Sequence, residues 1–587
     1  MKYFYTDERN AQIVIALLKK HGIRKAIVSP GTTNICLVAS MQQDPFFEMY
    51  SAADERSAGY IACGLAAESG EPVLLSCTGA TASRNYMPAM TEAYYRKLPI
   101  LVVTSSRRNY RIGHNMDQIT DRTQLPKDVA KLSVQMPLVY DKESEWACMI
   151  AANKAMLELN HHGMGPVHIN LETNYSKVYD VKTLPEVNVI RRYNNLTKLT
   201  DLPKINAEKV VIMVGAHKRW NDELTNIVDE FCTKYNAIVL SDHISNYKGK
   251  YRTFAYLLSQ QKNYNSIIKN AELMIHIGDV NGSNYEINTK EVWRVNPDGE
   301  LRDTYGKLKN VFEMEEYEFF ERYVSMKKNS TTNNFYKEAQ KEIEKLYENI
   351  PELPFSNAWA AYKTSKKLPA NSVLHFGIQN SLRFWNFFET KKEVLGYCNT
   401  GGFGIDGNMS STIGASLYDK NKIYYCVLGD LAFFYDLNSL GNKNIGKNVR
   451  ILLVNNGKGT EFKLSGNPGY LFGDEADKYI AAGGHYGSKS KDLVKHYSQD
   501  LGFEYLSASN KEEYIKNLDK FISDKIYDKP IVFEIFTESS DENKSLTLLR
   551  EILEDKKITT RNNMKKVVKN VIGEKGIKNV KKILKNK

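Results

Sequence analysis

The sequence lacks the features that mark membrane, secreted and zinc-binding proteins. No stretch approaches the roughly 18 apolar residues that a membrane-spanning helix needs. The start, MKYFYTDERNAQ, is polar by its sixth residue, so we expect no signal peptide. The seven cysteines lie far apart and form no CxxC pair, which argues against disulfides and structural zinc. We therefore expect a reduced, cytoplasmic protein.

Most of the net positive charge lies in the C-terminal tail. The chain carries a net charge of +11, but residues 561–587 hold one Arg, nine Lys and one Glu, a net of +9. The other 560 residues therefore carry about +2, and we expect no nucleic-acid partner. Apolar residues at 564, 567, 568, 571 and 572 share one helical face of the tail. Such a helix can bind an anionic membrane surface or a partner, or stay solvated, and these alternatives stay open.

The rest of the chain is too long for a single hydrophobic core. Short apolar segments alternate with helical patterns, which is typical of buried parallel strands in α/β sheets. We predict an α/β protein of three consecutive doubly wound parallel-sheet domains, with a basic helical tail. The predicted bounds are 1–185, 186–345 (a central domain with a linker), 346–545 and 546–587 for the tail. The central domain has no GxGxxG string, so we expect it to bind neither nucleotide nor flavin.

Two polar pairs follow neighbouring apolar strands of the third domain. The strand IYYCVLGD ends in Gly429-Asp430, and VRILLVNN ends in Asn455-Asn456. Open α/β sheets bind ligands at the carboxyl ends of their strands. Carboxylate and amide oxygens suit magnesium, which completes its octahedron with phosphate and water. Each pair alone is an ordinary turn, but together they predict a magnesium and phosphate site, aided by the start of the next helix.

A carboxylate opens a helix of small residues in the first domain. Glu55 begins ERSAGYIACGLA, and a strand and the turn SCTGATAS follow. By itself, Glu55 is explained as a helix-start carboxylate favoured by the helix dipole. Thiamine chemistry offers another role, because a buried carboxylic acid against the pyrimidine nitrogen promotes the imine that removes the C2 proton.

Both halves of such a site occur in the expected order. The GD and NN pairs, and the string DERSAGYIACGLA with CTGATAS and AYYRKLPILVVTSS, resemble the thiamine-diphosphate-dependent enzyme superfamily. The resemblance implies thiamine diphosphate and Mg²⁺ as cofactors, with the metal bound by Asp430, Asn456 and the backbone carbonyl of Lys458. It also implies a homodimer or homotetramer whose subunits share active sites. Leu431 stands where the usual motif has Gly.

The resemblance is closest to the menaquinone-pathway synthase branch, which joins a unit from 2-oxoglutarate to isochorismate. SPG (29–31), EAYY, GPVHIN, GIDG and GDLAFFYDLNSL are similar to that branch. It implies a catalytic role for Gln118 and substrate contacts for Arg107 and Arg383, assisted by Asn115 or His114. Besides Glu55, Asp430 and Asn456, the cofactor contacts that it implies are Thr78, Gly79, Gln379, Phe403, Ile405 (the apolar wedge under thiamine), Gly429, Leu431 and Ala432.

Three substrate-site positions depart from the branch. Thr33 and Thr400 replace arginines, and Glu461 replaces an apolar residue. Loss of two guanidinium groups removes two bidentate carboxylate contacts. We therefore predict a decarboxylating carboligase that acts on a 2-oxo acid donor and another acceptor, such as a sugar or sugar nucleotide. The alternatives are a simple 2-oxo acid decarboxylase or acetolactate-synthase-like enzyme, and the synthase reaction of the branch itself.

Three further histidines need no catalytic role. His161 and His162 precede the GPVHIN strand, and we predict a solvated loop pair. His168 lies inside that strand, and we predict a core histidine with satisfied hydrogen bonds.

Overall fold

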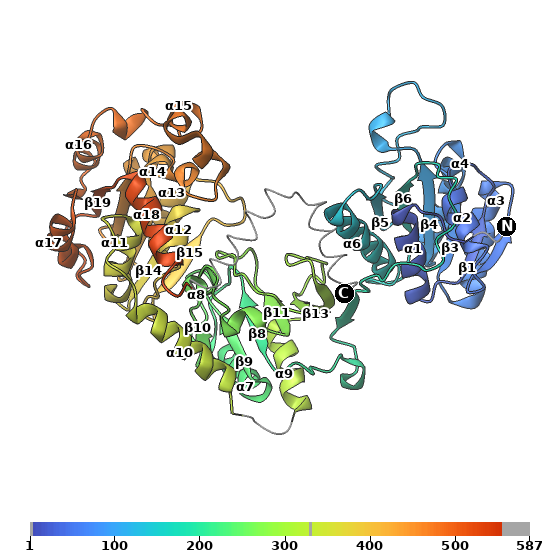
Figure 1. Cartoon of the computed structure of the whole chain (residues 1–587), viewed down its shortest axis with the longest axis horizontal. Helices are drawn as coiled ribbons and strands as arrows, with labels where there is room; N and C mark the ends of the chain where they lie inside the picture. Colours follow the sequence, from blue (N-terminus) through green and yellow to red (C-terminus); the bar gives the residue numbers. More distant parts are fainter. Residues whose placement is uncertain (1–3, 328–331, 555–587) are drawn as a thin grey trace, which may run out of the picture. The chain divides into compact units, whose positions relative to one another are not determined.

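The computed structural model describes residues 4–327 and 332–554 (Figure 1). The chain divides into two compact units, residues 1–194 with 298–313, and residues 195–297 with 314–587. Helix α18 (Ser539–Arg550) covers the start of the predicted tail, and residues 555–587 lie outside the described ranges. Among the described helices, none is both long and apolar enough to cross a bilayer. The seven cysteines are free thiols.

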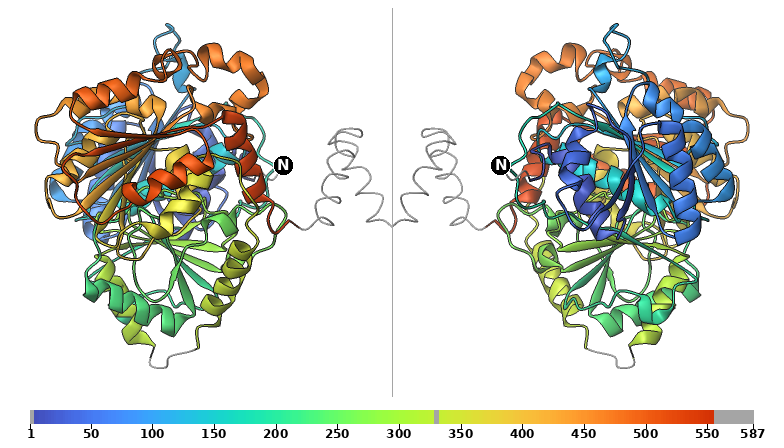
Figure 2. Two further views of the ribbon diagram at one scale, coloured as in Figure 1. Left: turned by 90° about the vertical axis from the view of Figure 1, so that its left-hand side faces the viewer. Right: turned by 90° about the vertical axis from the view of Figure 1, so that its right-hand side faces the viewer.

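The first unit is built on a six-stranded parallel sheet. Its alternate residues face two hydrophobic cores. Ala26 and Val28 belong to the core that α1 (Arg9–Lys20), α2 (Ile35–Met41) and α6 (Lys142–Glu158) complete. Ile27 belongs to the core that α3 (Glu55–Ser69) and α5 (Met87–Arg96) complete on the other face (Figure 2). The strands lie in the order β2 (Glu48–Ser51), β1 (Lys25–Val28), β3 (Val73–Thr78), β4 (Ile100–Ser106), β6 (Val167–Glu172), β5 (Leu132–Met136).

The second unit contains another six-stranded parallel sheet of the same plan. Its strands lie in the order β15 (Leu395–Cys398), β14 (Ser372–Phe376), β16 (Ile423–Gly429), β17 (Val449–Asn455), β19 (Ile531–Phe536), β18 (Glu504–Ala508). If the strands of each sheet are counted from its first one, both sheets read 2-1-3-4-6-5. The helices that pack on it include α11 (Asn357–Thr364), α12 (Asn380–Trp385), α13 (Asn408–Ser416), α14 (Asp430–Tyr435), α16 (Leu493–Asp500) and α17 (Lys511–Phe521).

The second unit also contains parallel strands of the central domain. They lie in the order β10 (Arg252–Thr253), β9 (Ala237–Leu240), β8 (Val210–Val214), β11 (Leu273–Ile277), β12 (Glu291–Val295). Helices α7 (Asp222–Tyr235), α9 (Glu316–Met326) and α10 (Asn334–Glu348) accompany them. In the first unit, β7 (Arg191–Asn194) pairs in parallel with β13 (Leu308–Glu313). The prediction of three parallel-sheet α/β domains is thus confirmed.

Candidate active site

A cavity of about 400 Å³ lies at the carboxyl edge of the third-domain sheet. It opens beside the ends of β14 and β16, the neighbouring strands at which a 2-1-3-4 strand order reverses direction. Many of the predicted residues line it, and they come from the ends of β14, β16 and β17 and from the loop before α13. They are Gln379, Phe403, Ile405, Gly429, Asp430, Leu431, Ala432, Asn456, Lys458 and Glu461.

Asp430 and Asn456 bring buried side-chain oxygen atoms to this cavity. Asp430 is only 4% exposed, and burial raises the pKa of its carboxyl to about 7, although backbone hydrogen bonds from Leu431, Gly457 and Asn456 oppose the rise. The side-chain oxygen of Asn456 is buried and has no hydrogen-bond partner among the described residues. Buried polar atoms are normally paired, and a buried carboxylate needs a counter-charge. The two side chains therefore fit an oxygen-liganded divalent cation.

Lys458 provides the third predicted ligand atom, its backbone carbonyl. That carbonyl already accepts a hydrogen bond from the Thr460 N–H at 2.9 Å, which leaves its second lone pair for a cation. The Lys458 ammonium forms an ion pair with Asp477. The side chain is thereby engaged while the carbonyl keeps its capacity as a ligand.

Four of the predicted residues have left-handed backbone conformations. Asn115 (φ 54°), Gln118 (φ 57°), Gln379 (φ 62°) and Phe403 (φ 56°) are all non-glycine residues with positive φ. Such conformations cost on the order of 1–3 kcal/mol each and concentrate at functional sites. The positive φ values show that the surrounding structure holds these four residues in uncommon backbone conformations.

Arg383 and Glu461 form a bidentate ion pair beside the cavity. Nη1 of Arg383 lies 2.6 Å from Oε2 of Glu461, and Nη2 lies 3.0 Å from Oε1. Each side chain is 22% exposed. The guanidinium that was predicted to bind the donor's carboxylate is therefore occupied by a carboxylate of the protein. Sequence analysis singled out both residues but did not predict that they contact each other.

Glu542 lines the same cavity, and sequence analysis missed it. One carboxyl oxygen accepts hydrogen bonds from the Asn357 N–H (2.8 Å) and the Thr537 hydroxyl (2.9 Å), and the other has no partner among the described residues. Burial raises the pKa of this carboxyl to about 7. The residue lies in α18, where an acidic side chain in a polar helix gives no sign of burial.

Substitution of Glu542 is expected to change how stability depends on pH. Its pKa is higher in the folded than in the unfolded chain, so the free energy of unfolding should fall between about pH 4.5 and 7, by up to about 3 kcal/mol. Glu542→Gln keeps the acceptor oxygen and removes this loss. The melting temperature of the variant should rise relative to the wild type as the pH increases from 5 to 8. The exposed Glu538→Gln is the control, and a difference independent of pH would contradict the assignment.

Glu55 is the first residue of α3 and is half-buried within its unit. The helix is capped by Asp54, whose side chain accepts a hydrogen bond from the Arg56 N–H at 3.0 Å. Glu55 is thus positioned by a capped helix end, and the first unit by itself does not enclose the carboxyl.

Gly79 begins the turn after β3, with Thr78 at the strand's last position. A Cβ at Gly79 would lie 1.3 Å from Nη1 of Arg122, so no other residue fits there without displacing that arginine. Arg122 is itself buried, and burial lowers the pKa of its guanidinium to about 10. Sequence analysis missed Arg122, which no motif marks.

The predicted substrate residues differ in their exposure. Thr33 is 2% exposed, and its hydroxyl donates a hydrogen bond to the backbone oxygen of Ser105 at 2.5 Å. Thr400, in the second unit, is also buried, and its backbone N–H donates to the carbonyl of Cys398 at 2.8 Å. Arg107 contacts Tyr175 and Asp117, each at 2.9 Å. The side chains of Asn115 and Gln118 are exposed in the loop that follows.

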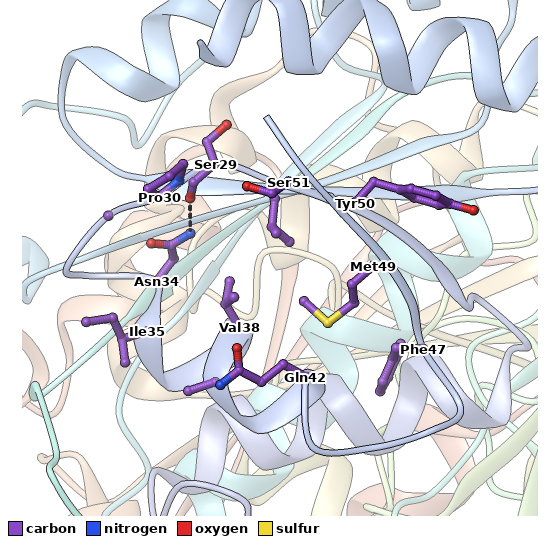
Figure 3. A pocket seen from close by; sticks show the side chains of 13 residues that line it. Ser29, Pro30, Asn34, Ile35, Val38, Gln42, Phe47, Met49, Tyr50 and Ser51 are labelled. Atoms are coloured by element: carbon purple, nitrogen blue, oxygen red, sulfur yellow. Dashed lines mark hydrogen bonds between the residues drawn. The ribbon is translucent and has the colours of Figure 1, made fainter. Parts of the chain in front are cut away.

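A second cavity, of about 560 Å³, lies in the first unit beside the SPG segment. Figure 3 shows side chains of α2 and β2 around it and the 3.0 Å hydrogen bond from the Asn34 amide to the backbone oxygen of Ser29. None of its lining residues is charged; they include Ser29, Asn34, Val38, Met49 and Ser51. This cavity therefore offers a ligand hydrogen bonds and apolar contact but no ion pair.

Two predictions about histidines had different outcomes. His168 is buried between the hydroxyls of Thr104 and Ser133, each at 2.8 Å, and burial lowers the pKa of its imidazole to about 3, which confirms a neutral core histidine. The prediction of a solvated pair at His161 and His162 is wrong for His161, whose side chain is 9% exposed, whereas that of His162 is 70% exposed.

Comparison with known proteins adds an independent line of observation. Residues 9–125 match the family "Thiamine pyrophosphate enzyme, N-terminal TPP binding domain". The chain is 32% identical to a 2-succinyl-5-enolpyruvyl-6-hydroxy-3-cyclohexene-1-carboxylate synthase of Bacteroides thetaiotaomicron, over 93% of this chain and 98% of that protein. Proteins of the same name are 32% identical in Phocaeicola vulgatus, over 93% and 98%, and 25% identical in Flavobacterium johnsoniae, over 90% and 96%.

Proposed function

We propose that this chain, which belongs to the 2-succinyl-5-enolpyruvyl-6-hydroxy-3-cyclohexene-1-carboxylate synthase family of thiamine pyrophosphate enzymes, catalyses the synthase reaction. The proposed activity is that of the synthase branch, the decarboxylation of 2-oxoglutarate and the addition of the remaining unit to isochorismate. The names of the relatives support this alternative better than the main prediction of another acceptor. The main prediction rested on the departures at Thr33, Thr400 and Glu461, and the names of the relatives do not support it.

The observation that carries the proposal is the buried carboxyl of Asp430 together with the side-chain oxygen of Asn456, which has no hydrogen-bond partner among the described residues. These side chains and the Lys458 carbonyl would bind Mg²⁺, and through it the cofactor's diphosphate. Thiamine diphosphate, when bound, supplies the nucleophilic carbon and the electron sink for loss of CO₂. Glu55 would hold a proton on its carboxyl oxygen against the pyrimidine nitrogen.

Other side chains of the protein would support the cofactor and orient the substrate. Ile405, which is partly buried and packs against the third-domain core, would support the bent cofactor as an apolar wedge. Gln118 and Asn115 would orient the substrate, and Arg107 would bind a carboxylate. Because Glu55 and Asp430 lie in different units of the chain, we propose a homo-oligomer in which two subunits complete each site.

Recognition of the donor would depend on the pair formed by Arg383 and Glu461. The distal carboxylate of 2-oxoglutarate matches a guanidinium in charge and geometry. In the structure Glu461 already makes that bidentate contact. The donor must therefore replace Glu461 at Arg383, and the internal ion pair lowers the donor's apparent affinity.

Removal of the charge on Glu461 is expected to strengthen donor binding. Glu461→Gln keeps the size of the side chain but competes for Arg383 as a neutral group, so the KM for 2-oxoglutarate should fall about tenfold, or about 1.4 kcal/mol. Initial rates at saturating isochorismate measure the change. Asp474→Asn, a fully exposed carboxylate in the same segment, is the matched control. A higher KM in Glu461→Gln would show that Glu461 contacts the substrate instead.

The proposed function is tested by incubation of the purified chain with thiamine diphosphate, Mg²⁺, 2-oxoglutarate and isochorismate. The expected result is CO₂ release that depends on both substrates, with the coupled product identified by mass. The uncharged cavity beside SPG favours one second candidate, a carboligase with a neutral acceptor such as a sugar. Release of CO₂ with a sugar acceptor, and no product from isochorismate, would select that candidate and overturn the first.

A further inference from the structure

A cluster of histidine and glutamate side chains lies in the first unit, and none of its members has a role in the proposed reaction. It comprises His161 and His162 in the loop after α6, and Glu313 at the last position of β13. One potential ligand atom from each residue lies within 4.8 Å of the others. Sequence analysis singled out the two histidines but could not connect them to Glu313, which is more than 150 residues away.

Both imidazoles present the same nitrogen to the Glu313 carboxylate. Nε2 of His161 lies 3.1 Å from Oε2, and Nε2 of His162 contacts Oε1. The rings are stacked, with centroids 3.8 Å apart. Zinc ligand atoms at about 2.0–2.1 Å from a tetrahedral ion lie about 3.3 Å from one another. The distance between His161 and Glu313 is therefore already close to that of two ligands of one ion.

The second nitrogen of His161 has the partner that metal-binding histidines usually have. Nδ1 lies 2.9 Å from a carboxyl oxygen of Glu158, the last residue of α6. A carboxylate in this place fixes the imidazole's orientation and leaves Nε2 with a free lone pair. Lys131 and Arg192 form ion pairs with Glu158, at 3.6 and 3.8 Å, whereas the ion pairs of Glu313 among the described residues are to the two histidines. Arg192 also interacts electrostatically with Glu313, but the ion-pair contacts of that carboxylate are to the two imidazoles.

The loop that carries the histidines is fixed by the surrounding chain. The Lys131 ammonium donates hydrogen bonds to the backbone oxygens of His161 and Gly163, the second at 2.7 Å. His162 has a φ of 46°, an uncommon conformation for a non-glycine residue, and its ring stacks on that of His161. On the opposite side, Gly299 leaves room for Glu313, because a Cβ there would lie 2.8 Å from Cγ of Glu313. The three side chains are therefore preorganised.

We propose that His161, His162 and Glu313 bind one Zn²⁺ or a similar divalent transition-metal ion. Two imidazole nitrogens and one carboxylate form a known three-residue donor set for zinc, with water or another ligand in the fourth position. His162, at 70% exposure, gives the ion access from solvent. The ion would link the loop after α6 to the end of β13 and stabilise the first unit. This inference is independent of the proposed reaction.

Metal binding is tested on the full chain with thiamine diphosphate and excess Mg²⁺, after treatment with a chelator. Calorimetric titration with Zn²⁺ should find one ion per chain, and Co²⁺ should give the visible absorption of a tetrahedral site. His162→Ala should weaken binding at least tenfold and abolish the Co²⁺ spectrum. The variant should fold, because His162 is mostly exposed, and circular dichroism checks this. His496→Ala, an exposed histidine in α16, should bind Zn²⁺ like the wild type.

A second variant shows whether His162→Ala weakens Zn²⁺ binding only by changing the conformation of the loop. Glu313→Gln keeps the shape of the side chain and removes its charge, and it should also weaken Zn²⁺ binding at least tenfold. Zn²⁺ should raise the melting temperature of the wild type and of His496→Ala but not of either site variant. Equal Zn²⁺ affinity in wild type and His162→Ala would overturn the proposal. So would the lack of any Zn²⁺ binding by the wild type.

Discussion

Replacement of Glu55 by glutamine is expected to lower kcat by about 10²–10⁴-fold and to leave cofactor affinity nearly unchanged. The amide keeps the size of the side chain but cannot exchange a proton with the pyrimidine nitrogen. Diphosphate binding should persist, because the proposed cation site at Asp430 and Asn456 lies in the other unit of the chain. The measurements are CO₂ release at saturating substrates and the rate of hydrogen–deuterium exchange at C2 of the bound cofactor.

The matched control for this variant lies in the same helix. Glu68 is an exposed carboxylate near the end of α3, and Glu68→Gln should retain full activity. If Glu55→Gln kept more than about a tenth of the wild-type kcat, the carboxyl would not be the proton donor, since a positioned acid contributes at least about 10²-fold.

Replacement of Asp430 by asparagine is expected to weaken binding of Mg²⁺ and thiamine diphosphate by at least about 100-fold, or about 2.7 kcal/mol. The change removes the charged ligand from a buried site and keeps its volume. Without cofactor, the substitution should stabilise the chain at pH 8. Burial raises the pKa of Asp430 to about 7, so the wild-type carboxyl is charged at pH 8 without a counter-charge, and the variant should melt at a higher temperature at that pH.

Titration calorimetry with and without Mg²⁺, and melting curves at pH 5 and 8, measure these two effects. Asp528→Asn, fully exposed at the surface of the second unit, is the control. Unchanged cofactor affinity in Asp430→Asn would exclude the cation site. If Asp430→Asn stabilised the chain as much at pH 5 as at pH 8, the buried charge would not be the cause of the stabilisation.

A mixture of the two inactive variants tests whether subunits share sites. If Glu55 of one subunit serves the cofactor bound by another, a hybrid of Glu55→Gln and Asp430→Asn subunits contains one intact site. Mixed and reassociated subunits should then regain up to about a quarter of the wild-type activity in a dimer. No recovery, in a mixture shown to contain hybrids, would place both residues of each site in one chain.

The sequence predicted the elements that depend on local pattern and missed those that depend on distant contacts. The strands before Asp430 and Asn456 were predictable because each is a continuous apolar run between turn signals. The pairing of Arg383 with Glu461 joins residues 78 positions apart, and no local pattern encodes it. The same is true of Glu542, whose burial depends on its contact with Asn357.

The departures from the resembled branch also did not predict where a side chain points. Thr33 was predicted at the substrate, but its hydroxyl is bonded to the Ser105 carbonyl in the interior. A short hydroxyl side chain can satisfy itself on a neighbouring strand, whereas an arginine at the same position could not. The chain does lack the arginine at this position, but the threonine that stands there does not indicate which acceptor binds.

The repeated 2-1-3-4-6-5 strand order has a consequence for how such an enzyme can diversify. One copy of the sheet carries the residues proposed to retain the cofactor, and the other carries the carboxyl proposed to activate it. Retention and turnover are therefore separable traits, encoded in different stretches of the gene. Loops at the edge of the first sheet can acquire new acceptor contacts while the second sheet preserves the cofactor's affinity. Recombination that exchanges residues 1–185 between relatives is a direct route to new specificities.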